Sequence, residues 1–317
     1  MILDKNPTIR TVINKIDEIG EQSEYRTFNF EFLAGKPDTN VEVHEGNCVF
    51  RFDYSKVYWN SRLETEHRRL VNKFQAGEAI CDVMAGVGPF AMPAGKKHCF
   101  VWANDLNPES YASLEDAVGR NKVRGYPVLF SCWHRLMNFQ VANFVRPFNQ
   151  DGRAFIRSAA RELIASQFAV DITPKQSRTE RIAGSEEPPP VYLTCPKTFS
   201  HYVLNLPASA LSFLPAFIGV YAGYSGLFEA KESRKLPMVH VHCFSTKSDD
   251  NKAEERKICQ EISQQLNYEI RPGDPENEGE AEIWDVRDVA PLKRMFCASF
   301  RLPQGVAFRE RQDQTEP

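Results

Sequence analysis

The stretch Ala79-Ile80-Cys81-Asp82-Val83-Met84-Ala85-Gly86-Val87-Gly88-Pro89-Phe90-Ala91 runs from an apolar segment into a glycine-rich turn. Residues 79–84 predict a buried strand, and the residues after Phe90 predict a helix. Gly86 and Gly88 let the backbone of the turn approach a ligand closely, and the start of the helix offers unpaired N–H donors. This strand, turn and helix predict a ligand site at the carboxyl end of a strand.

Strand and helix patterns alternate from residue 65 onward. Helices are expected over 66–73, 110–122 and 252–266, and strands over 99–103, 145–148, 202–205, 239–244, 284–289 and 295–302. Alternation of this kind predicts right-handed crossovers and a parallel sheet covered by helices on both faces. The expected fold class is therefore α/β with a Rossmann-like sheet, and the last two strands predict a β-ribbon that closes one sheet edge.

Other segments differ from this alternating region. Residues 1–64 mix a helix pattern over 9–19 with β-rich stretches over 28–33, 41–43 and 48–52, so we expect a small N-terminal α+β subdomain. Residues 65–309 form the second expected domain, and residues 310–317 form a tail. Residues 168–190 and 271–282 are rich in polar residues, glycine and proline; both predict surface loops, and the first predicts disorder.

The composition is that of an ordinary soluble protein. The 317 residues are 42% hydrophobic, with a net charge of -3 and a pI near 6.2, so any RNA contact must come from local patches. Eight scattered cysteines, without a CxxC pair or a zinc-ligand spacing, predict reduced thiols and no metal. No segment has the apolar length of a membrane span, and residues 1–21 lack the pattern of a signal or transit peptide.

Acidic and amide side chains follow the next predicted strands. Asp105 lies in Ala-Asn-Asp-Leu-Asn-Pro (103–108), at the spacing where an acid accepts hydrogen bonds from a ribose. Asp151 follows the strand over 145–148 and suits an adenine amino group, and Asn205 begins Asn-Leu-Pro. Polar groups at successive strand ends predict a nucleoside-type cofactor at this edge of the sheet.

Two alternatives stay open on these residues alone. Gly86, Gly88 and Ala91 fit the dinucleotide fingerprint G-x-G-x-x-G/A, which predicts an NAD-linked oxidoreductase. Alternatively, the glycines only make a tight turn and Asp105 caps the helix that follows. The third strand end, with Asp151, favours a nucleoside cofactor over both.

The motifs, taken in order, resemble those of one enzyme family. Asp-x-x-Ala-Gly-Val-Gly-Pro-Phe (82–90), Asn-Asp-Leu-Asn-Pro (104–108), Asp-Gly-Arg (151–153) and Asn-Leu-Pro (205–207) are similar to the motif series of the archaeal and eukaryotic tRNA (guanine-N1) methyltransferases, and the likeness runs from about residue 5 to residue 309. The resemblance implies a class I methyltransferase fold, S-adenosyl-L-methionine (SAM) as cofactor, and methylation of guanine at position 37, just 3′ of the tRNA anticodon. The cofactor pocket that it implies consists of His67, Gly86, Gly88, Asp105, Leu106, Asp151, Gly152 and Asn205.

Methylation of guanine N1 sets a definite chemical requirement. N1 carries a proton at neutral pH, so a base must remove it, and a cation must stabilise the negative charge that develops on O6. Residues 58–69 (YWNSRLETEHRR) also resemble the family. The resemblance implies that Glu66 is the general base, that Tyr58 and Arg62 organise the pocket, and that Arg26 contacts O6. On spacing alone, Arg62 and Glu66 could form a surface pair worth roughly a few tenths of a kcal/mol.

The implied partner is the anticodon stem-loop of tRNA. A single-stranded loop lets a base splay out and stack on aromatic side chains, for which Tyr58 and Trp59 are candidates. Arg68, Arg69 and Lys73 would lie along one helix, although such basic runs are more often solvated surface. We expect a monomer without a membrane contact, acting in the cytoplasm and nucleus, with the mitochondrial matrix as a further compartment.

Two features depart from the family. Longer members begin with a further module that grips the tRNA body, and we expect this chain to lack it. Residues 123–140 (VRGYPVLFSCWHRLMNFQ) interrupt the link to Asp151, and their deletion would join Lys122 to Val141 and restore the family's Asn-Lys-Val. We interpret this stretch as a translated intron or a lineage-specific loop, in which Cys132 and His134 do not bind metal.

Two further functions remain as alternatives. A tRNA aminocarboxypropyl transferase of wybutosine synthesis resembles this family in fold and SAM pocket but moves a different group of the cofactor; Glu66 and Arg26 favour methyl transfer instead. A non-catalytic tRNA-binding protein would bind tRNA and form no product at high SAM.

Overall fold

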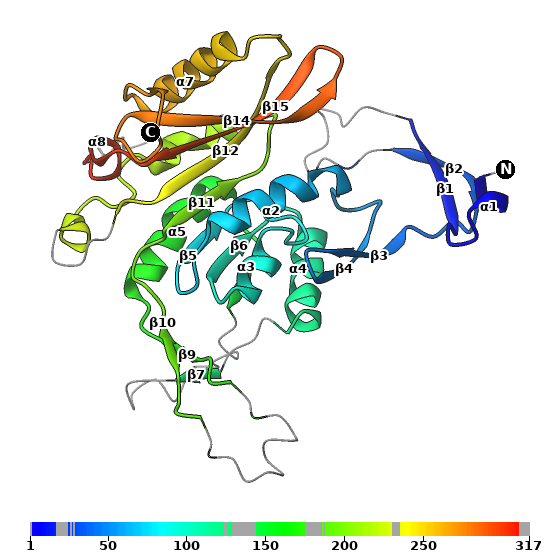
Figure 1. The fold of residues 1–317 in the computed structure, drawn as a ribbon, viewed down its shortest axis with the longest axis horizontal. Coiled ribbons are helices and arrows are strands. Elements are labelled where there is room, and N and C mark those ends of the chain that lie inside the picture. Colours follow the sequence, from blue (N-terminus) through cyan, green and yellow to red (C-terminus); the bar gives the residue numbers. More distant parts are fainter. Residues whose placement is uncertain are drawn as a thin grey trace, which may run out of the picture.

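An eight-stranded sheet, ordered β13-β14-β15-β12-β11-β5-β6-β8, forms the centre of the computed structural model, which describes residues 2–16, 25, 27, 29–122, 126–128, 144–174, 176, 186, 188–229 and 235–310 (Figure 1). Strands β12, β11, β5, β6 and β8 run parallel, whereas β15 is antiparallel to β12 and β14. The α/β sheet and its β-ribbon edge are therefore confirmed. The strands are β5 (Ala79–Asp82), β6 (Phe100–Asn104), β8 (Val145–Phe148), β11 (His201–Leu204), β12 (Met238–Thr246), β13 (Arg271–Pro272), β14 (Glu280–Ala290) and β15 (Lys293–Arg301).

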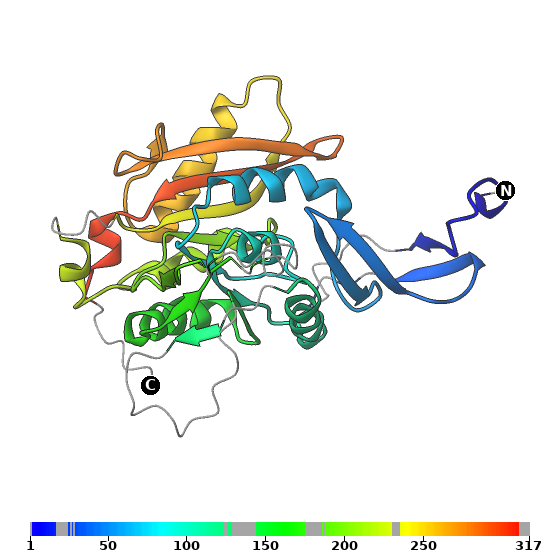
Figure 2. The ribbon, with the colours of Figure 1, turned by 60° about the horizontal axis from the view of Figure 1, so that its bottom comes forward.

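Helices cover both faces of this sheet (Figures 1 and 2). Apolar residues of α2 (Glu64–Lys73), α3 (Ala91–Lys96) and α4 (Pro108–Arg120) form one buried cluster with one face. Those of α5 (Gly152–Ala165), α7 (Lys252–Leu266) and the 3-10 helix η3 (Ala210–Phe217) form a second cluster with the other face. The short helices η4 (Ser225–Phe228) and α8 (Gln304–Ala307) follow η3 and β15.

The N-terminal part contains α1 (Ile2–Lys5), the 3-10 helix η1 (Ser61–Leu63) and two antiparallel hairpins. Strand β1 (Thr11–Lys15) pairs with β2 (Phe30–Gly35), and β3 (Asn40–Glu45) pairs with β4 (Cys48–Asp53). The predicted helix over 9–19 is wrong, because residues 11–15 form a strand. Thr11, Val12 and Ile13 are all β-branched, which favours a strand, and β2 supplies partners for their backbone groups.

The second hairpin shares a core with the sheet. Phe50 and Trp59 lie in the same buried cluster as Leu70 of α2. The Asn121 side chain, at the end of α4, both donates to and accepts from the backbone of Val49 at 2.8 Å. A domain division after residue 64 remains a prediction, and it would cut through this shared packing.

The segments expected to be loops contain short strands. Strand β9 (Ala169–Asp171) pairs with β10 (Tyr192–Thr194) and with β7 (Tyr126–Val128), so the disorder predicted from residue 168 is wrong at its start, where Phe168 and Val170 are buried. The loop predicted over 271–282 is wrong at both ends, because β13 pairs with the start of β14. Residues 175, 177–185 and 187, most of the stretch 123–140 and the tail from residue 311 lie outside the described residues. Within the described ranges, no helix has the length and apolarity that crossing a bilayer requires.

Candidate active site

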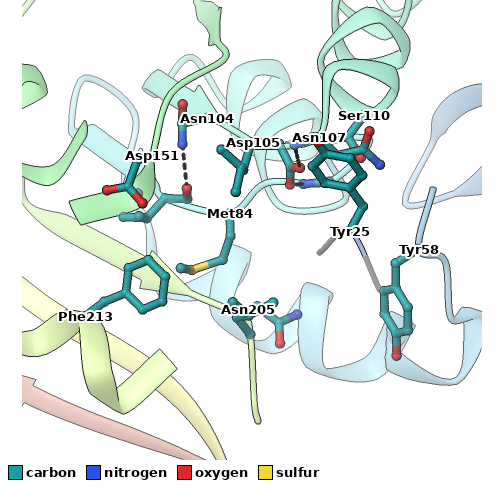
Figure 3. Close-up of a pocket in the computed structure, with 15 residues that line it drawn as sticks. Tyr25, Tyr58, Met84, Asn104, Asp105, Asn107, Ser110, Asp151, Asn205 and Phe213 are labelled. Atoms are coloured by element: carbon teal, nitrogen blue, oxygen red, sulfur yellow. Dashed lines mark hydrogen bonds between the residues drawn. The ribbon is translucent and has the colours of Figure 1, made fainter. Parts of the chain in front are cut away.

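A cavity opens where β5, β6, β8 and β11 reach their carboxyl ends (Figure 3). Six predicted cofactor residues line it together, namely Gly86, Asp105, Leu106, Asp151, Gly152 and Asn205. The other lining residues are Tyr25, Tyr58, Val83, Met84, Asn104, Asn107, Ser110, Leu206 and Phe213. The edge of the sheet that the sequence predicts is therefore the edge that carries the cavity.

Backbone donors fix the Asp105 carboxylate at the cavity wall. The N–H of Gly86 donates to its Oδ2 at 2.8 Å, and the N–H of Asn107 donates to its Oδ1 at 2.9 Å. Burial raises the pKa of Asp105, and these two bonds oppose that rise. Gly86 has a φ of +57°, and a Cβ there would meet no atom within 4 Å, so space lies beside it. The carboxylate also accepts from the Ser110 side chain, and its two oxygens together keep lone-pair capacity for a ligand's hydroxyl.

Two asparagines brace the loop that carries Asp105. The Asn104 side chain donates to the carbonyls of Val83 and Gln150 at 3.0 Å, which ties the ends of β5, β6 and β8 together. Asn107 caps α4 by accepting from the N–H of Glu109 at 3.0 Å. The position of Asp105 thus follows from the strand ends and from the helix start.

Asp151 and Gly152 form the opposite side of the cavity. Asp151 caps α5, since its Oδ1 accepts from the N–H groups of Arg153 and Ala154 at 2.9 and 3.1 Å. No described residue donates to its Oδ2, which is available to a ligand. A Cβ on Gly152 would lie 2.9 Å from the Phe213 ring, so glycine allows that aromatic side chain to close the wall.

Two residues at the carboxyl ends of β5 and β11 carry buried oxygens without a partner in the described part of the chain. Asn205 Oδ1 is buried and accepts no hydrogen bond from the described residues. Figure 3 shows its amide between Met84 and Tyr58. Both oxygens of Asp82, at the end of β5, likewise lack a donor within the described part, and burial together with the Asp105 carboxyl raises the pKa of Asp82 to about 8. Because buried polar atoms are normally paired, the unpaired Asn205 oxygen indicates a site that a ligand completes.

The predicted base, Glu66, lies outside the cavity lining. It sits on α2 and is 3% exposed. Arg69 donates to both of its oxygens, at 2.7 and 2.8 Å, and His242 of β12 lies 2.8 Å from Oε1. Burial alone would raise the pKa of Glu66, but the hydrogen bonds from Arg69 and His242 outweigh it and lower that pKa to about 2.

The other predicted catalytic residues, Tyr58, Arg62 and Arg26, differ in their position relative to the cavity. Tyr58 lines the cavity (Figure 3). Arg62 lies in η1 and is exposed, and the surface pair that spacing allows with Glu66 is not the pairing observed. Arg26 lies outside the described residues, although its neighbour Tyr25 lines the cavity.

Two predicted cofactor residues also lie away from the lining. His67 is buried, with its Nδ1 2.6 Å from Glu45 Oε1 and its ring edge-on to Phe90. Gly88 has a φ of +95°, and a Cβ there would lie 2.7 Å from Leu114, so this glycine allows the turn to approach α4. A cofactor contact by either residue remains a prediction.

Sequence reasoning did not single out Tyr25, Ser110, Phe213 or His242. Tyr25 adjoins Arg26 in Tyr-Arg-Thr-Phe, and its membership of that motif was an available signal. Phe213 lies in an apolar run that is typical of core. His242 ends Val-His-Val-His (239–242), a period-two alternation that marks a polar face of a buried strand.

Comparison with known proteins places the chain among related sequences. Residues 41–164 match the TRM5/TYW2 methyltransferase domain. The tRNA (guanine(37)-N(1))-methyltransferases of Fusarium vanettenii and Neurospora crassa are each 52% identical to this chain over 98% of its length, and the chain spans 63% and 62% of theirs. The crystal structure of Trm5b from Pyrococcus abyssi has the same fold, with a TM-score of 0.57 and 21% identity, over 95% of this chain and 67% of that one.

Proposed function

This chain belongs to the TRM5/TYW2 methyltransferase family, and we propose that it transfers a methyl group from SAM to N1 of guanine 37 in tRNA. Relatives that carry this activity in their names match nearly the whole chain at 52% identity. The observation that carries the proposal is the joint placement of Asp105, Asp151 and the unpaired Asn205 oxygen around one cavity.

The cavity residues fit SAM. Asp105 is held by the backbone N–H groups of Gly86 and Asn107 and can accept a hydrogen bond from a ribose hydroxyl. Asp151 Oδ2 can accept from an adenine amino group, and Phe213 and Leu106, which line the same cavity, offer apolar surface for the adenine ring. Asn205 Oδ1 can accept from the amino group of the methionine part. When bound, SAM supplies a methyl group, whose bond to the sulfonium sulfur breaks as the bond to guanine N1 forms, leaving S-adenosylhomocysteine.

The chain's own residues would prepare the guanine for this transfer. We assign proton removal from N1 to the Glu66 carboxylate, and stabilisation of the charge on O6 to Arg26. The Tyr58 ring, at the cavity mouth, would orient the base. These roles rest on the family resemblance together with the position of Tyr58 at the cavity.

A methylation assay tests the proposal. The chain is incubated with SAM and tRNA transcripts that carry guanine or another base at position 37, and the nucleosides are analysed by mass spectrometry. We expect N1-methylguanosine only from the guanine transcript. An aminocarboxypropyl product, or tRNA binding without product at high SAM, would replace methyl transfer by one of the alternative functions.

Glu66→Ala provides the sharper version of this assay. We expect the variant to lose at least about a hundredfold in methyl transfer rate, which is the lower end of the usual contribution of a general base. SAM binding, measured by calorimetry, should persist because Glu66 does not line the cavity. Retained methylation would remove Glu66 from the role of base.

The remaining proposals concern the setting of the reaction. We propose that a monomer acts on the anticodon stem-loop, in the cytoplasm and nucleus and also in the mitochondrial matrix. Light scattering of the purified chain, methylation of an isolated stem-loop, and imaging of a tagged copy test these three points separately.

A further inference from the structure

The surroundings of Glu66 contain more positive charge than an ordinary ion pair. Among the described residues, the three hydrogen bonds to its carboxylate come from cations or potential cations, two from Arg69 and one from His242. The Glu66 side chain is 2% exposed and that of His242 is 0% exposed, so water does not screen the group. Arg69 is itself held, since its guanidinium carbon lies 5.0 Å from the Trp284 ring centroid.

His242 connects this cluster to the cofactor cavity. Its Nε2 faces Glu66, and its Nδ1 faces the carbonyl oxygen of Leu204 at 3.4 Å, next to Asn205. Both ring nitrogens therefore face acceptors, which is the arrangement that a doubly protonated imidazolium requires. Burial alone would lower the pKa of His242, but the neighbouring Cys297 and Glu66 side chains outweigh it and raise that pKa to about 10.

Among the described residues, charged and titratable side chains of several elements surround Glu66 and His242. They are Arg69 on α2, His240 on β12, Cys297 on β15 and Asp82 on β5. Glu66, His242 and Cys297 offer ligand atoms within 4.8 Å of one another, which would also suit a metal ion. Arg69, however, already donates to both oxygens of Glu66, so a metal would have to share that carboxylate with a guanidinium.

We propose that Arg69 and His242 are positioning residues that hold Glu66 in a resting position, which the carboxylate leaves when the target guanine binds. This inference rests on the proposed function. Glu66 is buried, does not line the cavity, and has both oxygens occupied by Arg69. A carboxylate held by two cations is a weak base, whereas a general base works best when its strength suits the operating pH.

Release of Glu66 has a consequence for His242. An imidazolium in a dry site loses most of its stabilisation when its carboxylate partner leaves, so it should give up a proton. The N1 proton of the guanine passes to Glu66 and then to solvent, and the His242 proton also passes to solvent. The protonation state of His242 therefore reports the position of Glu66 without any measurement of activity.

Histidine-selective nuclear magnetic resonance of the full chain reads this state directly. The ring of His242 is assigned with His242→Gln, and spectra are recorded at pH 8 with S-adenosylhomocysteine and an anticodon stem-loop. We expect a doubly protonated ring without RNA, a neutral ring with the guanine stem-loop, and a doubly protonated ring with the adenine stem-loop, because adenine N1 carries no proton. A ring that stays doubly protonated in the guanine complex would overturn the resting position.

Glu66→Gln is the matched control, because it keeps the shape of the side chain and removes its charge. His242 should then be neutral at pH 8 even without RNA. If this variant fails to fold, as judged by circular dichroism, Arg69→Lys replaces it: it keeps the positive charge but cannot donate to both oxygens at once. In Arg69→Lys, Glu66 should leave its resting position more readily, so the His242 ring should become neutral at a lower concentration of the guanine stem-loop. An unchanged or higher concentration would contradict the proposal.

The pH dependence of single-turnover methylation gives a second test. His242→Gln removes one cation from the surroundings of Glu66, so the carboxylate should become protonated at a higher pH. The fall of the methylation rate on the acid side of the pH profile should therefore move to higher pH. The ratio of the rate at pH 8 to that at pH 5 should rise several-fold. An equal loss of rate at all pH values would assign His242 a merely structural role. If Glu66→Ala is inactive and His242 stays charged in the guanine complex, the resting position of Glu66 is wrong but its role as the base stands. If Glu66→Ala is active, Glu66 is not the base.

Discussion

The two faces of the central sheet bury different chemistry, although the same strands build both. On β12, Val239 and Val241 point into the apolar cluster beneath α5, α7 and η3. The alternate residues, His240 and His242, lie on the opposite face, where His242 meets Glu66 of α2. β15 repeats this division, with Phe296, Ala298 and Phe300 on the apolar side and Ser299 hydrogen-bonded to His240 at 2.8 Å.

This difference separates what the fold needs from what the function needs. An apolar face gains stability simply from the area that it removes from water. A buried group of charged or polar side chains, such as Glu66 and His242, contributes little net stability and becomes unfavourable when one partner is lost. The α2 face also buries an apolar cluster, but its charged side chains add less stability than apolar ones would, and the role that we propose for Glu66 accounts for them.

Removal of one charge from the α2 face should have the largest effect on stability. Arg69→Leu leaves the Glu66 carboxylate buried with His242 alone, and we expect the free energy of unfolding to fall by about 3–5 kcal/mol. Urea denaturation measures this change. A loss below about 1 kcal/mol would mean that water reaches Glu66 and that the two faces do not differ as described.

A triple variant sharpens the same comparison. Replacement of Glu66, Arg69 and His242 together by leucine makes the α2 face resemble the α5 face, and buried ionic groups replaced in this way are often as stable as the original or more so. We expect the triple variant to be more stable than Arg69→Leu and to have no methyl transfer activity. Stability below that of Arg69→Leu would show that the charges themselves stabilise the fold.

The stability of the α2 face should depend on pH in a definite direction. The pKa of Glu66 is lowered to about 2 from 4.5, so its contribution is present above pH 4.5 and is lost as the pH falls through 2. The pKa of His242 is raised to about 10 from 6.5, so its contribution is present below pH 6.5 and is lost as the pH rises through 10.

The variant His242→Gln allows this pH dependence of stability to be measured. The difference in free energy of unfolding between the original chain and the variant should be about 2 kcal/mol at pH 6, the size of a hydrogen bond to a charged group, and should shrink toward pH 10. Leu163→Ala, in the apolar cluster, serves as the control, since its cost should not change with pH. A pH-independent difference for His242→Gln would contradict the ionised pair.

The two glycines of the turn allow a smaller test of the α2 face. Gly88 packs against Leu114 of α4, whereas Gly86 faces open space at the cavity. We expect Gly88→Ala to be about 1–2 kcal/mol more destabilising than Gly86→Ala, because only the first overpacks the core. Gly86→Ala should instead weaken SAM binding, which calorimetry measures. Equal losses of stability in the two variants would mean that α4 shifts to accommodate the added methyl group.

The sequence predicted the parts of this molecule that local patterns specify. The run 79–91 located the central strand and its turn, and the polar groups at Asp105, Asp151 and Asn205 located the cavity edge, because parallel strands end together. The helix predicted over 9–19 is wrong, because the charged residues of that stretch fit a helical spacing whereas pairing with β2 makes residues 11–15 a strand.

Long-range contacts account for what the sequence did not predict. His242 lies 176 residues from Glu66 along the chain, so no local spacing could indicate that it takes the place of Arg62 beside that carboxylate. The placement of His67 against Glu45 and of Gly88 against Leu114 likewise depends on how the β3–β4 hairpin and α4 pack. Motif resemblance predicts candidate site residues, but packing decides which of them line the cavity.

The smallest effect should come from the rim of the α2 face. Lys73, at the end of α2, donates to Glu282 of β14 at 2.7 Å, and both side chains are 37% exposed. Exposed pairs of this kind contribute at most about 1 kcal/mol, so Lys73→Met should change the free energy of unfolding by less than that, and less still in 1 M salt. Chemical denaturation at two salt concentrations measures both values. An effect as large as that of Arg69→Leu would show that the charged cluster extends to the surface, and the contrast between the two faces would then be one of extent as well as of chemistry.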